Sequence, residues 1–420
     1  MSQWLSEVIA TAQTHQDWLA PHRQAALAEL EKVRWPLRKV EDWRFTPLIP
    51  VEKRSVSLAK PENTEFSAPK IGELSAIELV FSGNELLSDV CALSLPEGLE
   101  IVRFSSATGE QQQVIESLLS DVKPAKHLFG QVNDALLADG LYIKVAAGKT
   151  IDTPIRISQL ASNEGDQHLR VLMQVEAGAR ATVLEDGYGD ASSVNTAFSE
   201  YVLHSEAHLE HYRFAMFTQQ AMHVGGCHFK VAEKAQLNST LIGYGSQLSR
   251  LDVDVIYTGE FANANINAIY LLAEGELFDL HTTIEHAVPN CTTEENARGI
   301  VGDRAKAVFN GRIHIHRDAQ KTLAELNNRN LLLSRRAVIN TKPELEIYAD
   351  DVKCAHGATV AEIDDTALYY LLTRGISRSQ ALIMLNFGFI QELINQIPNE
   401  DIAGWLLSQL HDRFVGMEVK

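Results

Sequence analysis

A weak internal repeat of about 28 residues constrains the fold of this chain more than any other feature of its sequence. Four alanines occupy like places in successive short segments and are separated by 28, 28 and 27 residues: Ala179, Ala207, Ala235 and Ala262. The step continues less clearly to Asn290 and Ala319. Strand-like stretches also begin near the half-steps, so each period holds two strand-and-turn units. This pattern is typical of a β-solenoid, in which each coil stacks on its neighbours.

An antiparallel sandwich of many short strands is the main alternative for the repetitive part of the chain. Sandwich strands follow one another at irregular spacing, whereas the spacing here is regular, so the repeat favours a solenoid. The length of the chain supports the same interpretation. A chain of 420 residues exceeds what one hydrophobic core usually serves, unless the fold is elongated or repetitive.

Changes in hydrophobic period divide the chain into four parts. Residues 1–50 show apolar positions at helical spacing and are expected to form an N-terminal helical region. Residues 51–149 are a mixed α/β segment that leads into the solenoid, and residues 150–360 are the β-helix core. Residues 361–420 return to the helical period and form a C-terminal helical region.

Three helices are expected in the C-terminal region. Their cap residues are Asp364 or Asp365, Ser377 and Asn399. The second helix has apolar residues on more than one face, and four of them are candidate partner contacts: Leu382, Leu385, Phe389 and Leu393. An apolar surface wider than one stripe packs either against two internal neighbours or against a protein partner.

Composition and cysteine usage exclude several classes of protein. With 37 basic and 55 acidic residues the net charge is −18, which opposes binding to the phosphates of nucleic acid. No run of eighteen apolar residues occurs, and the start lacks the basic segment of a signal peptide. The four cysteines are far apart, with no CxxC pair, and suit neither a disulfide framework nor a self-contained metal cage: Cys91, Cys227, Cys291 and Cys354. We therefore expect a cytoplasmic protein that binds neither nucleic acid nor a membrane.

The residues with the most reactive chemistry lie where the repeat ends, between Pro343 and Val360. If strand alternation holds through this segment, the odd positions point inward: Leu345, Ile347 and Ala349. The even positions then point outward together: Glu346, Asp350, Cys354 and His356. A thiol and an imidazole two residues apart are both metal ligands. Two ligands cannot close a tetrahedral site, so a metal here needs donors from a second subunit.

Other histidines alternate along predicted strands, but no cysteine or carboxylate set completes them. We interpret them as exposed strand residues: His204, His208, His211, His314 and His316.

Two long motifs connect the chain to a known family. The segment KPELEIYADDVKCAHGATV, residues 342–360, closely resembles the C-terminal motif of the SufD branch of the SufB/SufD family. RKVEDWRFTPL, residues 38–48, resembles the N-terminal helical-domain motif of the same branch. The likeness extends over nearly the whole chain, and both motifs occur in the expected order.

The resemblance implies a fold, a role and a set of partners. The fold would be a right-handed parallel β-helix between N-terminal and C-terminal helical regions, paired with the paralogue SufB and holding the ATPase SufC through the C-terminal helices. The chain would be a non-catalytic scaffold of the SufB–SufC–SufD complex, and would contribute to iron acquisition. His356, and more weakly Cys354, would be transient ligands of iron or of a nascent iron–sulfur cluster at the SufB interface.

No permanently bound cofactor is expected in the isolated chain, and whether the complex holds a flavin stays open. No P-loop GxxxxGK[ST] is present, so ATP chemistry would come from SufC. Two alternatives remain. A polysaccharide-active β-helix enzyme would carry carboxylate clusters in a solenoid groove, and a homodimeric interaction scaffold would be indifferent to iron and to SufC.

Overall fold

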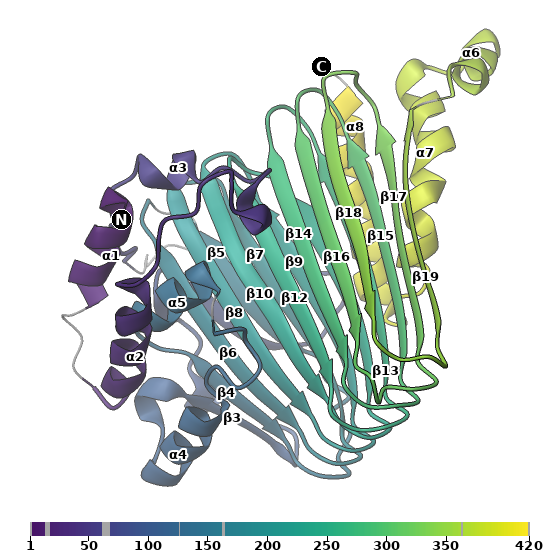
Figure 1. The fold of residues 1–420 in the computed structure, drawn as a ribbon. Coiled ribbons are helices and arrows are strands. Elements are labelled where there is room, and N and C mark those ends of the chain that lie inside the picture. The colour runs from purple at the N-terminus through teal and green to yellow at the C-terminus, as the bar shows by residue number, and fades with distance from the viewer. Residues whose placement is uncertain are drawn as a thin grey trace.

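The chain forms a β-solenoid of about eight turns with helices at both termini (Figure 1). The computed structural model describes residues 2–12, 17–60, 68–125, 127–161, 164–362 and 364–418. Successive strands alternate between two sheets, so each coil contributes one strand to each sheet. The mainly β fold predicted from the repeat is confirmed.

Pairing between neighbouring coils is parallel throughout the body of the solenoid. The ten-stranded sheet contains β1 (Ile77–Ser82), β2 (Glu85–Leu86), β5 (Ile155–Ala161), β7 (Arg180–Gly189), β9 (His208–Phe217), β11 (Gln236–Tyr244), β13 (Asn263–Leu272), β15 (Thr292–Val301), β17 (Leu323–Leu332) and β19 (Lys353–Glu362). The nine-stranded sheet contains β3 (Leu99–Arg103), β4 (Leu141–Val145), β6 (Gln167–Val175), β8 (Ser193–Leu203), β10 (Ala221–Val231), β12 (Ser249–Tyr257), β14 (Leu277–His286), β16 (Lys306–Ile315) and β18 (Val338–Ile347). Their inward side chains form the principal apolar core.

The repeat of alanines has a structural cause at one corner of each coil. Each alanine directly follows a residue with a left-handed backbone, such as Glu206 (φ 61°) or Lys234 (φ 56°). The corner turns the following side chain into the core, where Ala179, Ala207 and Ala235 are fully buried. The next equivalent positions are Cys291 and Thr322, which follow the left-handed residues Asn290 and Lys321. The fainter continuation to Asn290 and Ala319 was therefore misplaced by one to three residues.

The two ends of the solenoid differ. At the N-terminal end the last strand of each sheet is antiparallel: β2 pairs with β1, and β3 pairs with β4. At the C-terminal end β18 and β19 are the outermost strands, and no further strand of the described residues pairs with either. The N-terminal end is therefore bounded by reversed strands, whereas the C-terminal end is bounded by strands that keep the parallel direction of the coils.

The N-terminal helices cover the outer face of the nine-stranded sheet (Figure 1). They are α1 (Gln3–Ala12), α2 (Ala20–Leu30), α3 (Ile49–Glu52), and α4 (Gly109–Leu118) and α5 (Leu128–Ala135) from the following segment. Trp4 and Phe129 belong there to one apolar cluster with Phe198 of β8 and Val224 of β10. The predicted presence of helices in the N-terminal region is confirmed.

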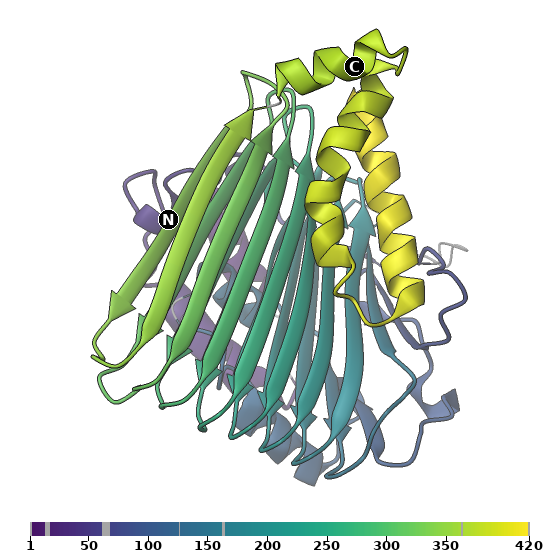
Figure 2. The same cartoon turned by 90° about the vertical axis from the view of Figure 1, so that its right-hand side faces the viewer.

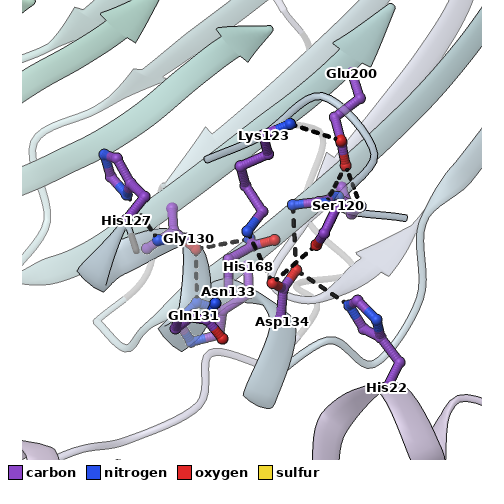
Figure 3. A network of polar contacts seen from close by, with 12 residues as sticks. His22, Ser120, Lys123, His127, Gly130, Gln131, Asn133, Asp134, His168 and Glu200 are labelled. Atoms are coloured by element: carbon purple, nitrogen blue, oxygen red, sulfur yellow. Dashed lines mark hydrogen bonds and ion pairs between the residues drawn. The ribbon is translucent and has the colours of Figure 1, made fainter. Parts of the chain in front are cut away.

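A buried polar network fastens this helical layer to the sheet (Figure 3). Asp134 of α5 pairs with Lys123 at 2.9 Å and with Arg170 of β6 at 3.2 Å. His22 of α2 lies 3.3 Å from the same carboxylate. Arg170 also pairs with Glu200 of β8, which accepts hydrogen bonds from the backbone N–H groups of the loop before α5.

The RKVEDWRF motif lies against the same sheet as an irregular segment with a short 3₁₀ helix, η1 (Glu41–Trp43). Trp43 is buried, and the Arg250 guanidinium lies 4.2 Å from the centroid of its ring. Thr46 donates a 2.5 Å hydrogen bond to Asp279 of β14. These contacts hold the motif in place beside β12 and β14.

The C-terminal helices α6 (Asp365–Thr373), α7 (Arg378–Ile394) and α8 (Glu400–Glu418) follow β19. Helices α7 and α8 run back along the outer face of the ten-stranded sheet (Figure 2). Their predicted N-caps are confirmed, because Asp364, Ser377 and Asn399 each accept hydrogen bonds from helix N–H groups. No described helix has the length and apolar character needed to cross a bilayer.

Candidate functional site at the open end of the solenoid

The open end exposes residues that belong to the solenoid interior. In β16, Ile313 and Ile315 face the core and are fully buried. Their partners one coil further on are Leu345 and Ile347 of β18, of which Ile347 is 41% exposed. As predicted, Leu345 and Ile347 occupy inward positions and Ala349 is buried. The last coil therefore continues the apolar columns of the core, and no further coil of the described residues covers them.

Cys354 and His356 also occupy inward positions, so their predicted outward orientation is wrong. In β19 they are in register with Ala324 and Leu326 of β17, which are both fully buried in the core. His356 is nevertheless exposed, because it lies on the outermost coil. The prediction assumed that side chains keep alternating between the two faces through the turn at residues 348–352. An irregular turn does not preserve this alternation. Glu346 lies before the turn and points outward as predicted, toward Arg312.

The two candidate ligands differ in accessibility. Cys354 is half-buried and packs against the end of the apolar core. Burial raises the pKa of its thiol, which disfavours the thiolate that binds metal. His356 is the more accessible donor. One imidazole and one thiol leave a tetrahedral metal at least two ligands short, so the pair is a partial site.

A polar patch lies on the outer face of the same end, over β14, β16 and β18. Arg312 donates to Glu346, and His314 lies 3.1 Å from the same carboxylate. His316 lies 2.6 Å from Glu285. Both histidines are partly exposed, as predicted, and each is engaged by a carboxylate.

Among the other histidines, His204 and His208 lie partly exposed near β9. His211 does not, and the prediction that it is exposed is wrong. It is fully buried inside the solenoid, where its Nε2 lies 3.1 Å from Glu185 Oε1. The alternation of polar and apolar residues does not reveal its position, because part of the solenoid interior is itself polar.

The predicted partner residues of α7 differ in burial. Leu382 and Leu393 are buried against the ten-stranded sheet and α8. Phe389 is half-buried, with the Arg298 guanidinium 5.6 Å from its ring centroid. Leu385 is 36% exposed. Sequence reasoning missed the most exposed apolar residues of this region, Tyr369, Tyr370 and Met384, which lie 56–69% exposed on α6 and α7.

Comparison with known proteins agrees with this architecture. A family model described as "SUF system FeS cluster assembly, SufBD core domain" matches residues 158–389, which is more than half of the chain. The iron–sulfur cluster assembly protein SufD of Escherichia coli (strain K12) is 28% identical over 405 residues, covering 94% of this chain and 93% of the relative. An iron–sulfur cluster assembly SufBD family protein of Synechocystis is 28% identical over 427 residues, covering 96% and 93%. The chain therefore belongs to the SufB/SufD family of the SUF system for iron–sulfur cluster assembly.

Proposed function

We propose that this protein is a non-catalytic scaffold subunit of a SufB–SufC–SufD complex, in which its open solenoid end pairs with SufB. The observation that carries the proposal is the uncovered last coil. Its inward residues include Ile347, which is 41% exposed, and the half-buried Leu345 and Cys354, and no described strand pairs with the outer edge of β18 or β19. A second chain that adds strands to these edges would pair their free backbone N–H and C=O groups. The same chain would cover the apolar side chains of the last coil. A paralogous solenoid has the matching coil geometry.

His356 is the proposed ligand that this subunit contributes at the SufB interface. The neutral imidazole binds iron or a forming cluster, and the remaining donors come from the partner. The iron or cluster is the cargo of assembly and is held transiently. Cys354 has the smaller role, because its thiol is half-buried against the core.

The C-terminal helices are the proposed contact for SufC. Their buried faces pack on the solenoid, and Tyr369, Tyr370, Met384 and Leu385 remain outside that packing as an exposed apolar surface. Helix α6 projects beyond the end of the sheets (Figure 1), so a partner can reach this surface without touching the open edges. The two proposed surfaces are therefore separate.

In vivo complementation with His356→Ala tests the ligand role. In a strain without other assembly routes, we expect the variant to keep the SufB–SufC–SufD complex, measured by pull-down, and to lose cluster maturation. Cys354→Ser is the matched variant on the same strand, and we expect it to retain most activity. Full complementation by His356→Ala would refute the ligand role, and loss of the complex would assign the residue a structural role instead.

A further inference from the structure

A second set of metal-ligand side chains lies deep inside the solenoid, away from the open end. Glu185 of β7, His211 of β9 and Cys227 of β10 each contribute a ligand atom, and these atoms lie within 4.8 Å of one another. All three residues are at most 1% exposed. The described part of the chain contains no other group of three such side chains at this spacing.

The distances within this group fit a tetrahedral ion. His211 Nε2 lies 3.1 Å from Glu185 Oε1, and Cys227 Sγ lies 3.8 Å from the same oxygen. Metal bonds of about 2.0 Å to oxygen and nitrogen and about 2.3 Å to sulfur place such atom pairs about 3.3 and 3.5 Å apart. These two distances are within about 0.3 Å of those values, and the third pair of atoms, His211 Nε2 and Cys227 Sγ, lies within 4.8 Å.

Neighbouring residues orient two of the three ligands. His211 Nδ1 hydrogen-bonds with Ser239 Oγ at 2.9 Å, which leaves Nε2 directed at the cluster. Arg213 donates to Glu185 Oε2 at 2.8 Å, so the other carboxylate oxygen, Oε1, faces His211 and Cys227. Outer partners of this kind fix the orientation of metal ligands in known sites.

Arg213 also opposes the binding of a cation, because its charge lies against the same carboxylate. Metal binding displaces the Cys227 proton, and the thiolate then adds a second negative charge beside Glu185. The two anions balance a divalent ion, and the remaining positive charge stays on Arg213 in the outer shell. A thiolate, an imidazole and a carboxylate together suit a borderline transition metal rather than Mg²⁺ or Ca²⁺.

We propose that Glu185, His211 and Cys227 bind one divalent transition-metal ion, of the Zn²⁺ or Fe²⁺ class, inside the solenoid. Tyr201, whose hydroxyl lies 2.6 Å from Glu185 Oε1, or a water supplies the fourth ligand. The ion bridges the two sheets, because β10 belongs to one and β7 and β9 to the other.

This site is distinct from the open end. His211 and His356 occupy the same column of the ten-stranded sheet, through Ser239, Ile266, Glu295 and Leu326. Five strand spacings separate them, or about 24 Å. The proposal therefore does not depend on the role of His356 or on the presence of SufB.

Refolding with Co²⁺ tests the proposal, because a buried site is loaded during folding. The full-length chain is unfolded, stripped with a chelator and refolded anaerobically with Co²⁺ or Zn²⁺. We expect one ion per chain, thiolate-to-cobalt charge-transfer absorption in the Co²⁺ form, and a higher unfolding temperature with either metal. Absence of the charge-transfer band in the refolded protein would overturn the proposal.

Three variants locate the ion. Cys227→Ala should lose the band, whereas Cys291→Ala, which removes another buried thiol, should keep it. The double variant Cys354→Ser/His356→Ala should also keep it. A band that persists in Cys227→Ala, or that disappears in the double variant, would overturn the assignment. If Cys227→Ala does not refold, Co²⁺ binding by Glu185→Gln tests the site instead. Weaker Co²⁺ binding would support the site, and unchanged binding would refute it.

Discussion

Glu295 is a buried acid in the interior of the solenoid with only part of its hydrogen-bonding capacity used. Thr282 donates a 2.7 Å hydrogen bond to Oε1, and Oε2 has no hydrogen-bond partner among the residues that the structure describes. Burial raises the pKa of Glu295 to about 7, and the Thr282 bond only partly offsets this. The folded protein therefore retains a proton that the unfolded chain releases near pH 4.3.

This difference predicts that Glu295→Gln stabilises the protein in a pH-dependent way. From about pH 4.3 to 7 the unfolded wild-type chain binds fewer protons than the folded one, so wild-type stability falls as pH rises. The glutamine side chain of the variant does not ionise, so its burial carries no pH-dependent penalty. Urea unfolding should show an advantage of the variant that grows across this window, to the order of 3 kcal/mol at pH 8. An advantage that is the same at pH 4.5 and pH 8 would contradict the assignment of a protonated Glu295.

Single residues show where sequence reasoning succeeds and where it ends. Inward positions in β18 were predictable, because Leu345 and Ile347 alternate within one regular strand. The orientation of His356 was not, since it depends on the geometry of the preceding turn. The group formed by Glu185 and Cys227 could not be predicted either, because the two residues are 42 positions apart and meet only through coil stacking.

The buried network around Asp134 is the clearest element-level link between the helical layer and the solenoid. Lys123→Met removes one of the charges that compensate Asp134, while Arg170 and His22 remain. We expect a loss of about 3 kcal/mol in the free energy of unfolding, measured in urea, because a buried carboxylate loses a partner.

Lys144→Met is the matched control for this variant. Lys144 pairs with Glu176 at 3.5 Å, and both side chains are partly exposed. Its removal should cost less than about 1 kcal/mol. Equal effects of the two substitutions would show that the network does not fasten the helical layer.

The C-terminal helices require point variants rather than deletion. Removing residues 364–420 would uncover apolar residues on the outer face of the ten-stranded sheet, including Phe214, Ile242, Ile269 and Ile300. A truncated protein could then lose SufC merely because its fold is damaged. Met384 is 63% exposed, so a charge at this position leaves the internal packing intact.

We expect Met384→Asp to weaken SufC binding at least tenfold, or about 1.4 kcal/mol, and to leave SufB binding unchanged. Leu37→Asp is the control, because Leu37 is 65% exposed in the N-terminal segment. Isothermal titration with each partner measures both effects. Unchanged SufC affinity in Met384→Asp would remove this surface from the proposed contact.

Local signals predicted the elements best. The helix caps at Asp364, Ser377 and Asn399 are short-range hydrogen-bond patterns, and the alanine step reports the corner of each coil. The position of the N-terminal helices on the nine-stranded sheet was not predictable. It depends on contacts such as that between Trp43 and Arg250, more than 200 residues apart.

At the scale of the whole molecule, the asymmetry of the two ends is the central feature. Reversed strands bound the N-terminal end, whereas the C-terminal end is bounded by parallel strands whose inward residues no further described coil covers. If the C-terminal end pairs with SufB as proposed, the reversed strands at the other end, which differ in direction from the coils, disfavour continued stacking into a fibre.

The most direct test of this account is the affinity of Ile347→Asp for SufB. Ile347 is an inward residue of the last coil, so a carboxylate there would be buried at the interface without a partner. Phe261→Asp is the control, because Phe261 is 57% exposed at a turn in the solenoid body. We predict at least a hundredfold loss of SufB affinity for Ile347→Asp and none for Phe261→Asp. Wild-type affinity in Ile347→Asp would contradict the claim that the open end is the SufB interface.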